Sequence, residues 1–453
     1  MKKLLVANRG EIARRIFRSA KALGIATVAV YSEADAQSAH VADSDEAYAI
    51  GRPPARESYL NVERILQVVR ESGADTVHPG YGFLSESAEF AETIIAAGLT
   101  WVGPTPQSIR DMGDKQRARD LAAAAGVPIV PGTGRFSVGD IAEVAEAAEK
   151  VGYPLLVKAV AGGGGIGMRR VDRAEQLVDT VTATQSMAEK AFGDGAVFLE
   201  RFVPKARHVE VQVFGFGDGT AIHLHERDCS LQRRFQKVIE ESPAPGLPAA
   251  VREKMTAAAV ALCRKTSYSG AGTIEFIVDA DSFDFFFLEM NTRIQVEHPV
   301  TEMVTGLDLV AMQIGFARGA LSSLAQEAVH ISGHAIECRL YAEDPAKMFM
   351  PSPGRLATFR LPEAGRHVRV DSGYREGDVV SPFYDPMIAK LIVWGVDRDD
   401  ARKRACEALR TVSIEGLRTN RDFLIACMED ETFAAGDVYT SFIDDHRKIL
   451  ITA

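Results

Sequence analysis

The stretch that decides the fold is Glu289-Met290-Asn291-Thr292-Arg293-Ile294-Gln295-Val296-Glu297-His298. It follows the apolar run Phe-Phe-Phe-Leu at 285–288, whose shortness and aromatic content favour a buried strand over a helix turn. Side chains on a strand alternate between faces, so Glu289, Asn291 and Arg293 are expected on one face. Two oxygen ligands followed by a cation, at the end of an apolar strand, indicate a site for a metal ion and a phosphate.

A second strand is expected just upstream, over 272–278, with a connecting turn over 280–284. Folding this hairpin about Ser282 places Glu275 opposite Glu289. Two carboxylates that face each other across a sheet repel, but a divalent cation such as Mg²⁺ between them removes the repulsion. The alternative is a register wrong by one residue, which would leave two solvated carboxylates at a sheet edge.

The composition is that of a soluble globular protein and excludes some functions. The 453 residues suggest about three domains, with 46% hydrophobic and 25% charged residues. A net charge of −10 argues against nucleic-acid binding. Five scattered cysteines without a CxxC pair fit neither a zinc site nor a disulfide framework. The charged amino terminus does not resemble a signal peptide, and no apolar stretch reaches membrane-span length, so we expect a cytoplasmic protein that is not bound to membranes.

The order of elements predicts a mixed α/β and α+β multidomain protein. Apolar strands alternate with amphipathic helices in the first hundred residues, which indicates an open parallel α/β sheet. Expected elements there are strands 2–7, 26–31 and 76–78 and helices 11–23, 61–71 and 88–97. Further on, helices 118–125 and 139–150 precede strands 153–160 and 169–171. From about His330, strands 334–340, 355–360, 368–370 and 388–394 and helices 402–409 and 420–428 suggest an α+β unit.

Two segments carry features of anion binding. The glycine run at 162–165 is not a Walker loop, because no Lys-Ser or Lys-Thr follows it, yet its backbone amides can approach phosphate oxygens as a lid. Lys158 adds a positive charge beside it. A flexible hairpin tip is the alternative. The run 226–237 concentrates Arg227, Arg233, Arg234 and Lys237, which indicates an anion pocket or, alternatively, a solvated basic face.

Seven ordered blocks resemble the biotin carboxylase family of the ATP-grasp superfamily, over nearly the whole chain. The blocks are 7–13, 78–86, 112–115, 162–168, 226–237, 289–302 and 381–390. The resemblance implies an N-terminal biotin carboxylase domain at 1–114, a central ATP-grasp domain at 115–329 with a glycine-rich lid at about 131–203, and a C-terminal α+β domain at 330–447.

The same resemblance implies a ligase that carboxylates biotin with ATP and bicarbonate, through carboxyphosphate, as the first half-reaction of an acyl-CoA carboxylase in fatty acid metabolism. Glu297 would be the general base, with Arg293, Arg339 and Lys237 as its catalytic partners. Bicarbonate and biotin would be bound by Lys237, Arg293, Gln295, Val296, Arg339 and Tyr81. ATP would contact Lys115, Lys158, Gly163, Gly164, Gly165, Glu200, Arg201, Val203, His208, Gln232, Glu275 and Glu289. Glu275, Glu289 and Asn291 would hold Mg²⁺ or Mn²⁺.

The chain departs from the common family pattern at Ala161, Ile166, Arg201 and Phe235, which puts lid closure and ATP affinity in doubt. No Met-Lys-Met sequence is present, so biotin is expected on a separate carrier protein or domain, with a carboxyltransferase subunit as a further partner. A homodimer is also implied. The acceptor, an acyl-CoA or a 2-oxo acid, is left open. The alternatives are another ATP-grasp carboxylate ligase and a non-catalytic subunit that binds nucleotide and regulates a complex.

Overall fold

The computed structural model describes residues 1–160, 167–234 and 236–451 and divides into two compact units. The first unit comprises Met1–Val127, Arg207–Phe276 and Glu289–Ala453, and the second comprises Pro128–Ala206 and Ile277–Leu288. The predicted glycine-lid residues Gly163, Gly164 and Gly165 lie outside the described residues, as do Ala161, Ile166 and Phe235.

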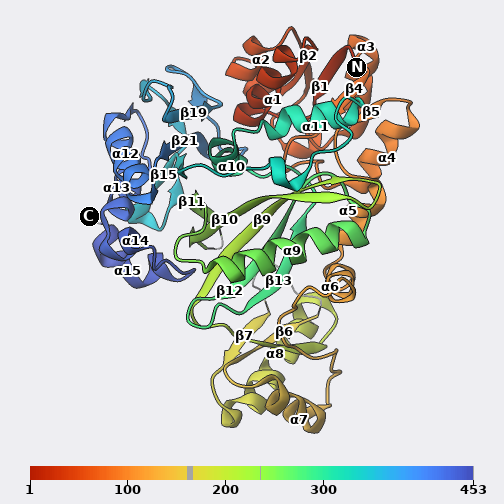
Figure 1. Cartoon of the computed structure of the whole chain (residues 1–453), viewed down its shortest axis with the longest axis vertical. Coiled ribbons are helices and arrows are strands. Elements are labelled where there is room, and N and C mark those ends of the chain that lie inside the picture. Colours follow the sequence, from red (N-terminus) through yellow and green to blue (C-terminus); the bar gives the residue numbers. More distant parts are fainter. Residues whose placement is uncertain (161–166, 235, 452–453) are drawn as a thin grey trace. The chain divides into compact units, whose positions relative to one another are not determined.

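The first unit begins with the expected parallel sheet (Figure 1). Its strand order is β3 (Glu46–Gly51), β2 (Ala26–Ser32), β1 (Lys3–Val6), β4 (Thr76–His78) and β5 (Thr100–Trp101), and all neighbours run parallel. The helices of this region are α1 (Gly10–Ala22), α2 (Ala39–Asp43), α3 (Val62–Ser72), α4 (Ala88–Ala96) and α5 (Pro106–Gly113). The predicted helices and strands are confirmed, whereas β3 was missed because only one of its residues is buried.

An eight-stranded sheet forms the centre of the chain. Its order is β13 (Phe285–Asn291), β12 (Ser269–Asp279), β9 (Ala206–Phe216), β10 (Ala221–Arg233), β11 (Gln236–Ser242), β14 (His334–Tyr341), β21 (Met387–Gly395) and β19 (Val368–Ser372). The predicted hairpin is confirmed, since β12 and β13 are neighbours joined by a short turn. However, β13 ends at Asn291, so the prediction that Arg293 continues the same strand is wrong. Helix α9 (Ala249–Lys265) packs against β10 (Figure 1).

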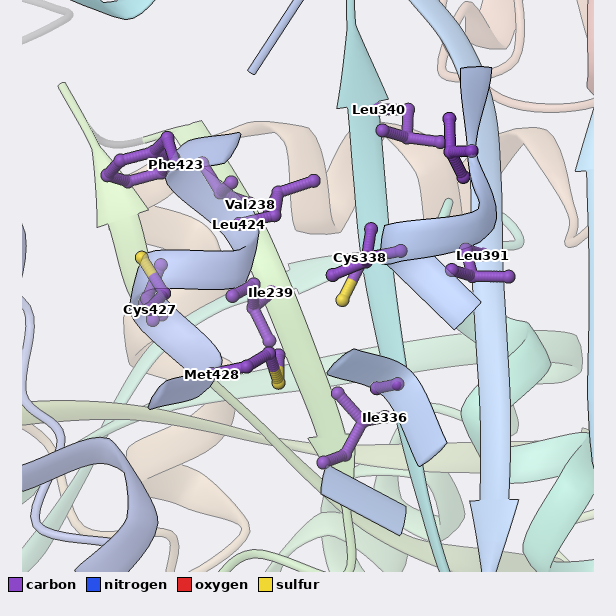
Figure 2. Packing of buried hydrophobic residues seen from close by; sticks show 14 of the residues in the cluster. Val238, Ile239, Ile336, Cys338, Leu340, Leu391, Phe423, Leu424, Cys427 and Met428 are labelled. Carbon is purple, nitrogen blue, oxygen red and sulfur yellow. The ribbon is translucent and has the colours of Figure 1, made fainter. Parts of the chain in front are cut away.

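The C-terminal strands of this sheet are covered by an apolar core (Figure 2). Side chains of β11, β14 and β21 pack there against α12 (Arg398–Thr411) and α13 (Arg421–Glu429). The predicted single strand over 355–360 is wrong: the chain makes β17 (Gly354–Arg355) and β18 (Thr358–Arg360), which pair with β20 (Val379–Val380) and β22 (Ser413–Glu415). Leu356 is fully buried between them, where the backbone changes partner. The remaining short elements are β15 (Glu343–Asp344), β16 (Met350–Pro351), α14 (Glu431–Ala435) and α15 (Phe442–Leu450).

The second unit is built on the three-stranded antiparallel sheet β7 (Met168–Val171), β6 (Leu155–Ala159) and β8 (Val197–Arg201). Helices α7 (Ile141–Val151) and α8 (Leu177–Phe192) pack on it (Figure 1). Alternate residues of β6 are buried, and they join a core with Val144, Val171 and Val181. The predicted strands and the helix over 139–150 are therefore confirmed, with bounds shifted by one or two residues.

No single helix among the described residues is long and apolar enough to cross a membrane. Two consecutive helices, α10 (His298–Thr305) and α11 (Leu309–Ala317), meet the length and composition criteria only when taken together, and they are bent by 95°.

Candidate active site

Lys237 is the centre of a buried ionic cluster in the first unit. Its Nζ lies 2.6 Å from Glu210 Oε2, 2.8 Å from Glu275 Oε1 and 2.6 Å from Glu297 Oε1. These carboxylates come from β9, from β12 and from the residue that precedes α10. Burial alone would lower the pKa of Lys237, but the three negative charges outweigh it and raise that pKa well above its usual value. Lys237 is therefore a permanent cation held in one place.

Arg227 fixes this cluster from below. It is fully buried, and its guanidinium donates to Glu210 Oε1 (2.6 Å), Gln212 Oε1 (2.8 Å), Thr301 Oγ1 (2.9 Å), Thr273 Oγ1 (3.2 Å) and Gln295 Oε1 (2.9 Å). All of its donors are thus used within the protein. The prediction that Arg227 belongs to an open anion pocket is wrong, and Arg233 is likewise engaged by Glu343. Sequence spacing gave no signal of this, because the partners come from four separate segments.

Glu297 lies between two cations. Besides Lys237, its Oε2 is 3.1 Å from Arg339 Nη2. Burial opposes ionisation, but the charges of Lys237, Arg339 and Arg227 outweigh it and hold the pKa of Glu297 far below its usual range. The sequence argument assigned the ionised state of Glu297 to Arg293. Arg293 instead contacts Asn291 Oδ1 (2.9 Å) and Glu86 (3.1 Å), so the reason differs although the state is the same.

The three residues predicted to bind a metal supply only oxygen ligands. Glu275 Oε1 accepts a hydrogen bond from Asn291 Nδ2 at 3.0 Å, and its Oε2 is 2.8 Å from His208 Nε2. Partial desolvation and the negative charge of Glu275 raise the pKa of Glu289. A second carboxylate that resists ionisation beside the first is stabilised by a divalent cation, so carboxylate and amide oxygens here fit a hard ion such as Mg²⁺.

His208, Glu210 and Glu275 also bring ligand atoms within 4.8 Å of one another. The ammonium group of Lys237 already binds both carboxylates, so this group is a salt-bridge network rather than a second metal site.

The other predicted nucleotide contacts of the first unit lie near Glu275. Glu275 raises the pKa of His208 in spite of burial, and the His208 Nδ1 is 3.0 Å from Gln232 Nε2. Gln232 also donates to Cys229 O at 2.9 Å, which orients its amide. Lys115 is exposed at the start of α6 (Lys115–Ala124).

In the second unit, Lys158 on β6 forms an ion pair with Glu200 on the neighbouring β8. Arg201 at the end of β8 is exposed, and Val203 just beyond it is buried. These residues meet the expectation of a strand edge with a fixed charge.

Tyr81 and Val296 are tied together through two residues that the sequence analysis did not single out. The Tyr81 hydroxyl donates to Glu11 Oε1, which lies 3.2 Å from Lys390 Nζ. Lys390, fully buried on β21, donates to Val296 O at 2.8 Å. Both residues lie inside the blocks 7–13 and 381–390, so the family resemblance was the only available signal for them.

Comparison with known proteins agrees with this geometry. Residues 1–109 match the biotin carboxylase N-terminal domain, residues 114–324 the ATP-binding domain of the carbamoyl-phosphate synthase L chain, and residues 337–445 the biotin carboxylase C-terminal domain. The chain is 49% identical to biotin carboxylase 1 of Bacillus subtilis, over 98% of this chain and 99% of that protein.

Two further relatives extend the comparison. The methylcrotonoyl-CoA carboxylase subunit alpha of Mus musculus is 50% identical over 99% of this chain, but the chain spans only 62% of that relative. The biotin carboxylase domain dimer of the Hydrogenobacter thermophilus 2-oxoglutarate carboxylase, solved with MgADP, ADP and bicarbonate, superposes with a TM-score of 0.90. It shares 44% identity, with 100% of this chain and 99% of that one covered. Because the match to a complete biotin carboxylase runs end to end, the chain belongs to the biotin carboxylase family.

Proposed function

We propose that the Lys237–Glu297–Arg339 cluster activates bicarbonate in an ATP-dependent carboxylation of biotin, the reaction of this enzyme family. The observation that carries the assignment is the placement of Glu297 between two buried cations, with Lys237 at 2.6 Å and Arg339 at 3.1 Å. Such a site can hold a small anion and an ionised base side by side, away from water.

Bicarbonate would be held by Lys237, Arg293 and the Gln295–Val296 segment. Glu297 is ionised in the free enzyme, so it is in the correct state to accept the bicarbonate proton. Its low pKa makes it a weak base until the anionic substrate draws Lys237 and Arg339 away from its oxygens. Substrate binding would therefore raise the basicity of Glu297 at the moment when it is needed. The bicarbonate oxygen then attacks the γ-phosphorus of ATP, which gives carboxyphosphate and ADP.

The nucleotide would be bound by Lys115, His208 and Gln232 of the first unit and by Lys158, Glu200, Arg201 and Val203 of the second. Glu275, Glu289 and Asn291 would hold magnesium, which supplies positive charge to the phosphate oxygens. Gly163, Gly164 and Gly165 remain proposed as lid contacts on the basis of the sequence alone.

Biotin would meet Arg339 and Tyr81. Arg339 is buried, and within the described part of the chain no hydrogen bond reaches its Nε. A buried donor without a partner is costly, and an anionic oxygen would satisfy it. The ureido oxygen of biotin becomes such an acceptor when its ring nitrogen loses a proton, so Arg339 would stabilise that charge while CO₂ from carboxyphosphate is captured.

The division into domains 1–114, 115–329 and 330–447 is also proposed, and the three matched ranges support it. Relatives of this chain are subunits of multi-subunit biotin-dependent carboxylases. Accordingly, a biotin carboxyl carrier protein or domain, a carboxyltransferase subunit and a second copy of this chain are the proposed partners. We propose the cytoplasm as the compartment. Which acyl-CoA or 2-oxo acid is finally carboxylated depends on the carboxyltransferase.

The test is ADP release from MgATP by the purified chain, with bicarbonate and free biotin each added or omitted. We expect release to require bicarbonate and to rise with biotin. Indifference to both substrates, or dependence on a different carboxylic acid, would assign the site to another ATP-grasp ligase. ATP binding without any turnover would assign the chain to a regulatory role.

A further inference from the structure

Two buried carboxyl groups outside the proposed mechanism face each other next to Arg339. Glu240 on β11 and Glu337 on β14 are direct partners in the antiparallel register, and both are fully buried. Carboxylates opposite each other across a strand pair repel, and burial increases that repulsion because no water screens it.

The face of β14 on which they lie is the face of the active site. Ala335 packs against Val300 and Val304 of α10. Since side chains alternate along a strand, Glu337 and Arg339 lie on the same face as Ala335. Glu297 immediately precedes α10, so this face brings the pair and the proposed base together.

Arg339 connects the pair to Glu297. Its Nη2 forms an ion pair with Glu240 Oε1 and lies 3.1 Å from Glu297 Oε2. Within the described residues, neither carboxyl oxygen of Glu240 or of Glu337 has a hydrogen-bond partner. The other titratable groups that act on the pair are Lys237 on β11, Cys229 on β10, Cys338 on β14, Lys390 on β21 and Glu297.

A proton shared between the two carboxyl groups would remove the repulsion and give each group a hydrogen-bond partner. In agreement, burial raises the pKa of Glu240 to about 7, against the attraction of Arg339. Burial raises the pKa of Glu337 well above its usual value, although Lys390 and Arg339 oppose this. The adjacent Glu241 behaves oppositely because Arg398 and His334 bind it directly.

We propose that Glu240 and Glu337 form a carboxyl pair that keeps one proton at neutral pH, and that Glu240 anchors Arg339 on the side opposite Glu297. Both are positioning residues. The role assigned to Arg339 rests on the proposed function, whereas the shared proton does not.

The retained proton matters because it sets the charge around Arg339. With one proton on the pair, Arg339 faces Glu240 and Glu297 and keeps part of its positive charge for a substrate oxygen. Loss of that proton at alkaline pH would add a second negative charge at the back of Arg339 and weaken its interaction with biotin.

Infrared difference spectroscopy tests the proton without any activity assay. The variant Glu337→Gln has the shape of the protonated side chain and is expected to fold. At neutral pH it should lack one protonated-carboxyl C=O band that the unsubstituted protein shows, because Glu240 alone ionises beside Arg339. Glu241→Gln is the matched control and should leave that band unchanged. An identical band in Glu337→Gln and the unsubstituted protein would overturn the proposal.

Kinetics test the positioning. In Glu337→Gln the alkaline limb of kcat/KM for biotin should move up by about one pH unit, since the pair can no longer gain that charge. Glu240→Gln should lower kcat for biotin carboxylation about tenfold while the KM for ATP stays within about twofold, because a small misplacement of Arg339 affects only the biotin step. An unchanged alkaline limb, or a parallel change of kcat, KM and thermal stability, would contradict the assignment. If no variant carboxylates biotin but the infrared band is lost as expected, the proposed function fails and the proton pair stands.

Discussion

The two faces of strand β14 do different work. Ile336, Cys338 and Leu340 on one face are fully buried in the apolar core that α12 and α13 cover (Figure 2). Glu337 and Arg339 on the other face are equally withdrawn from water but belong to the ionic network around Glu297. The core face stabilises the strand through apolar burial, and that stability keeps the charged face in place although several of its polar atoms lack hydrogen bonds.

The largest expected effect comes from the charged side. Glu297→Gln keeps the shape of the side chain but removes the proton acceptor, so bicarbonate-dependent ADP release should fall roughly 10²- to 10⁴-fold. Steady-state kinetics measure this, with Glu327→Gln, an exposed carboxylate, as the matched control. Retention of more than about a tenth of the activity in Glu297→Gln would mean that another group accepts the proton.

The corresponding change on the core face should affect stability and leave the chemistry intact. Leu340→Ala should lower the free energy of unfolding by about 2–5 kcal/mol, because it removes buried apolar contacts and leaves a cavity. Urea unfolding measures the loss, and kinetics at a temperature where the variant is folded should give a KM for bicarbonate within about twofold of the original value. A large rise in that KM would show that the two faces are not independent.

Much of this separation could be predicted from the sequence. Alternating strands and helices in the first hundred residues, the hairpin before Asn291 and the strand over 334–340 follow from local pattern, and the structure confirms them. The placement of Lys237 could not be predicted locally, since Glu210, Glu275 and Glu297 come from separate strands and a helix start. Arg227 was misassigned for the same reason: local pattern shows that a basic residue lies on a strand but does not reveal its partners.

The pair of adjacent glutamates on β11 gives the next prediction. Burial would raise the pKa of Glu241, but Arg398 and His334 outweigh it and lower that pKa from 4.5 to about 2. The carboxylate therefore stabilises the fold at neutral pH by about 3 kcal/mol, and this contribution is lost as the pH falls from about 4.5 to about 2. Glu241→Gln should lose that stability at neutral pH and show a flatter acid limb.

Thermal unfolding across the acid range measures the effect. The exposed Glu327→Gln should reproduce the acid limb of the unsubstituted protein. An acid limb in Glu241→Gln that is as steep as that of the control would contradict the ion pairing of Glu241.

The smallest effect is expected from a conservative change in the core. Ile336→Val removes one methylene next to Glu337 and should cost about 0.5–1.5 kcal/mol. Chemical denaturation checks the value, and the kinetic constants should be unchanged. A change in the pH profile of this variant would indicate that core packing, rather than the proton pair, sets the alkaline limb.

The most direct test of the central claim, that ATP activates bicarbonate at Glu297, follows the oxygen atoms. If bicarbonate attacks the γ-phosphorus and carboxyphosphate then releases CO₂, one bicarbonate oxygen must remain in the inorganic phosphate. With ¹⁸O-labelled bicarbonate and MgATP, the account predicts one labelled oxygen in each phosphate formed during biotin carboxylation, measured by mass spectrometry or ³¹P NMR. Phosphate that carries only solvent oxygen would contradict it, because water rather than bicarbonate would then have attacked ATP.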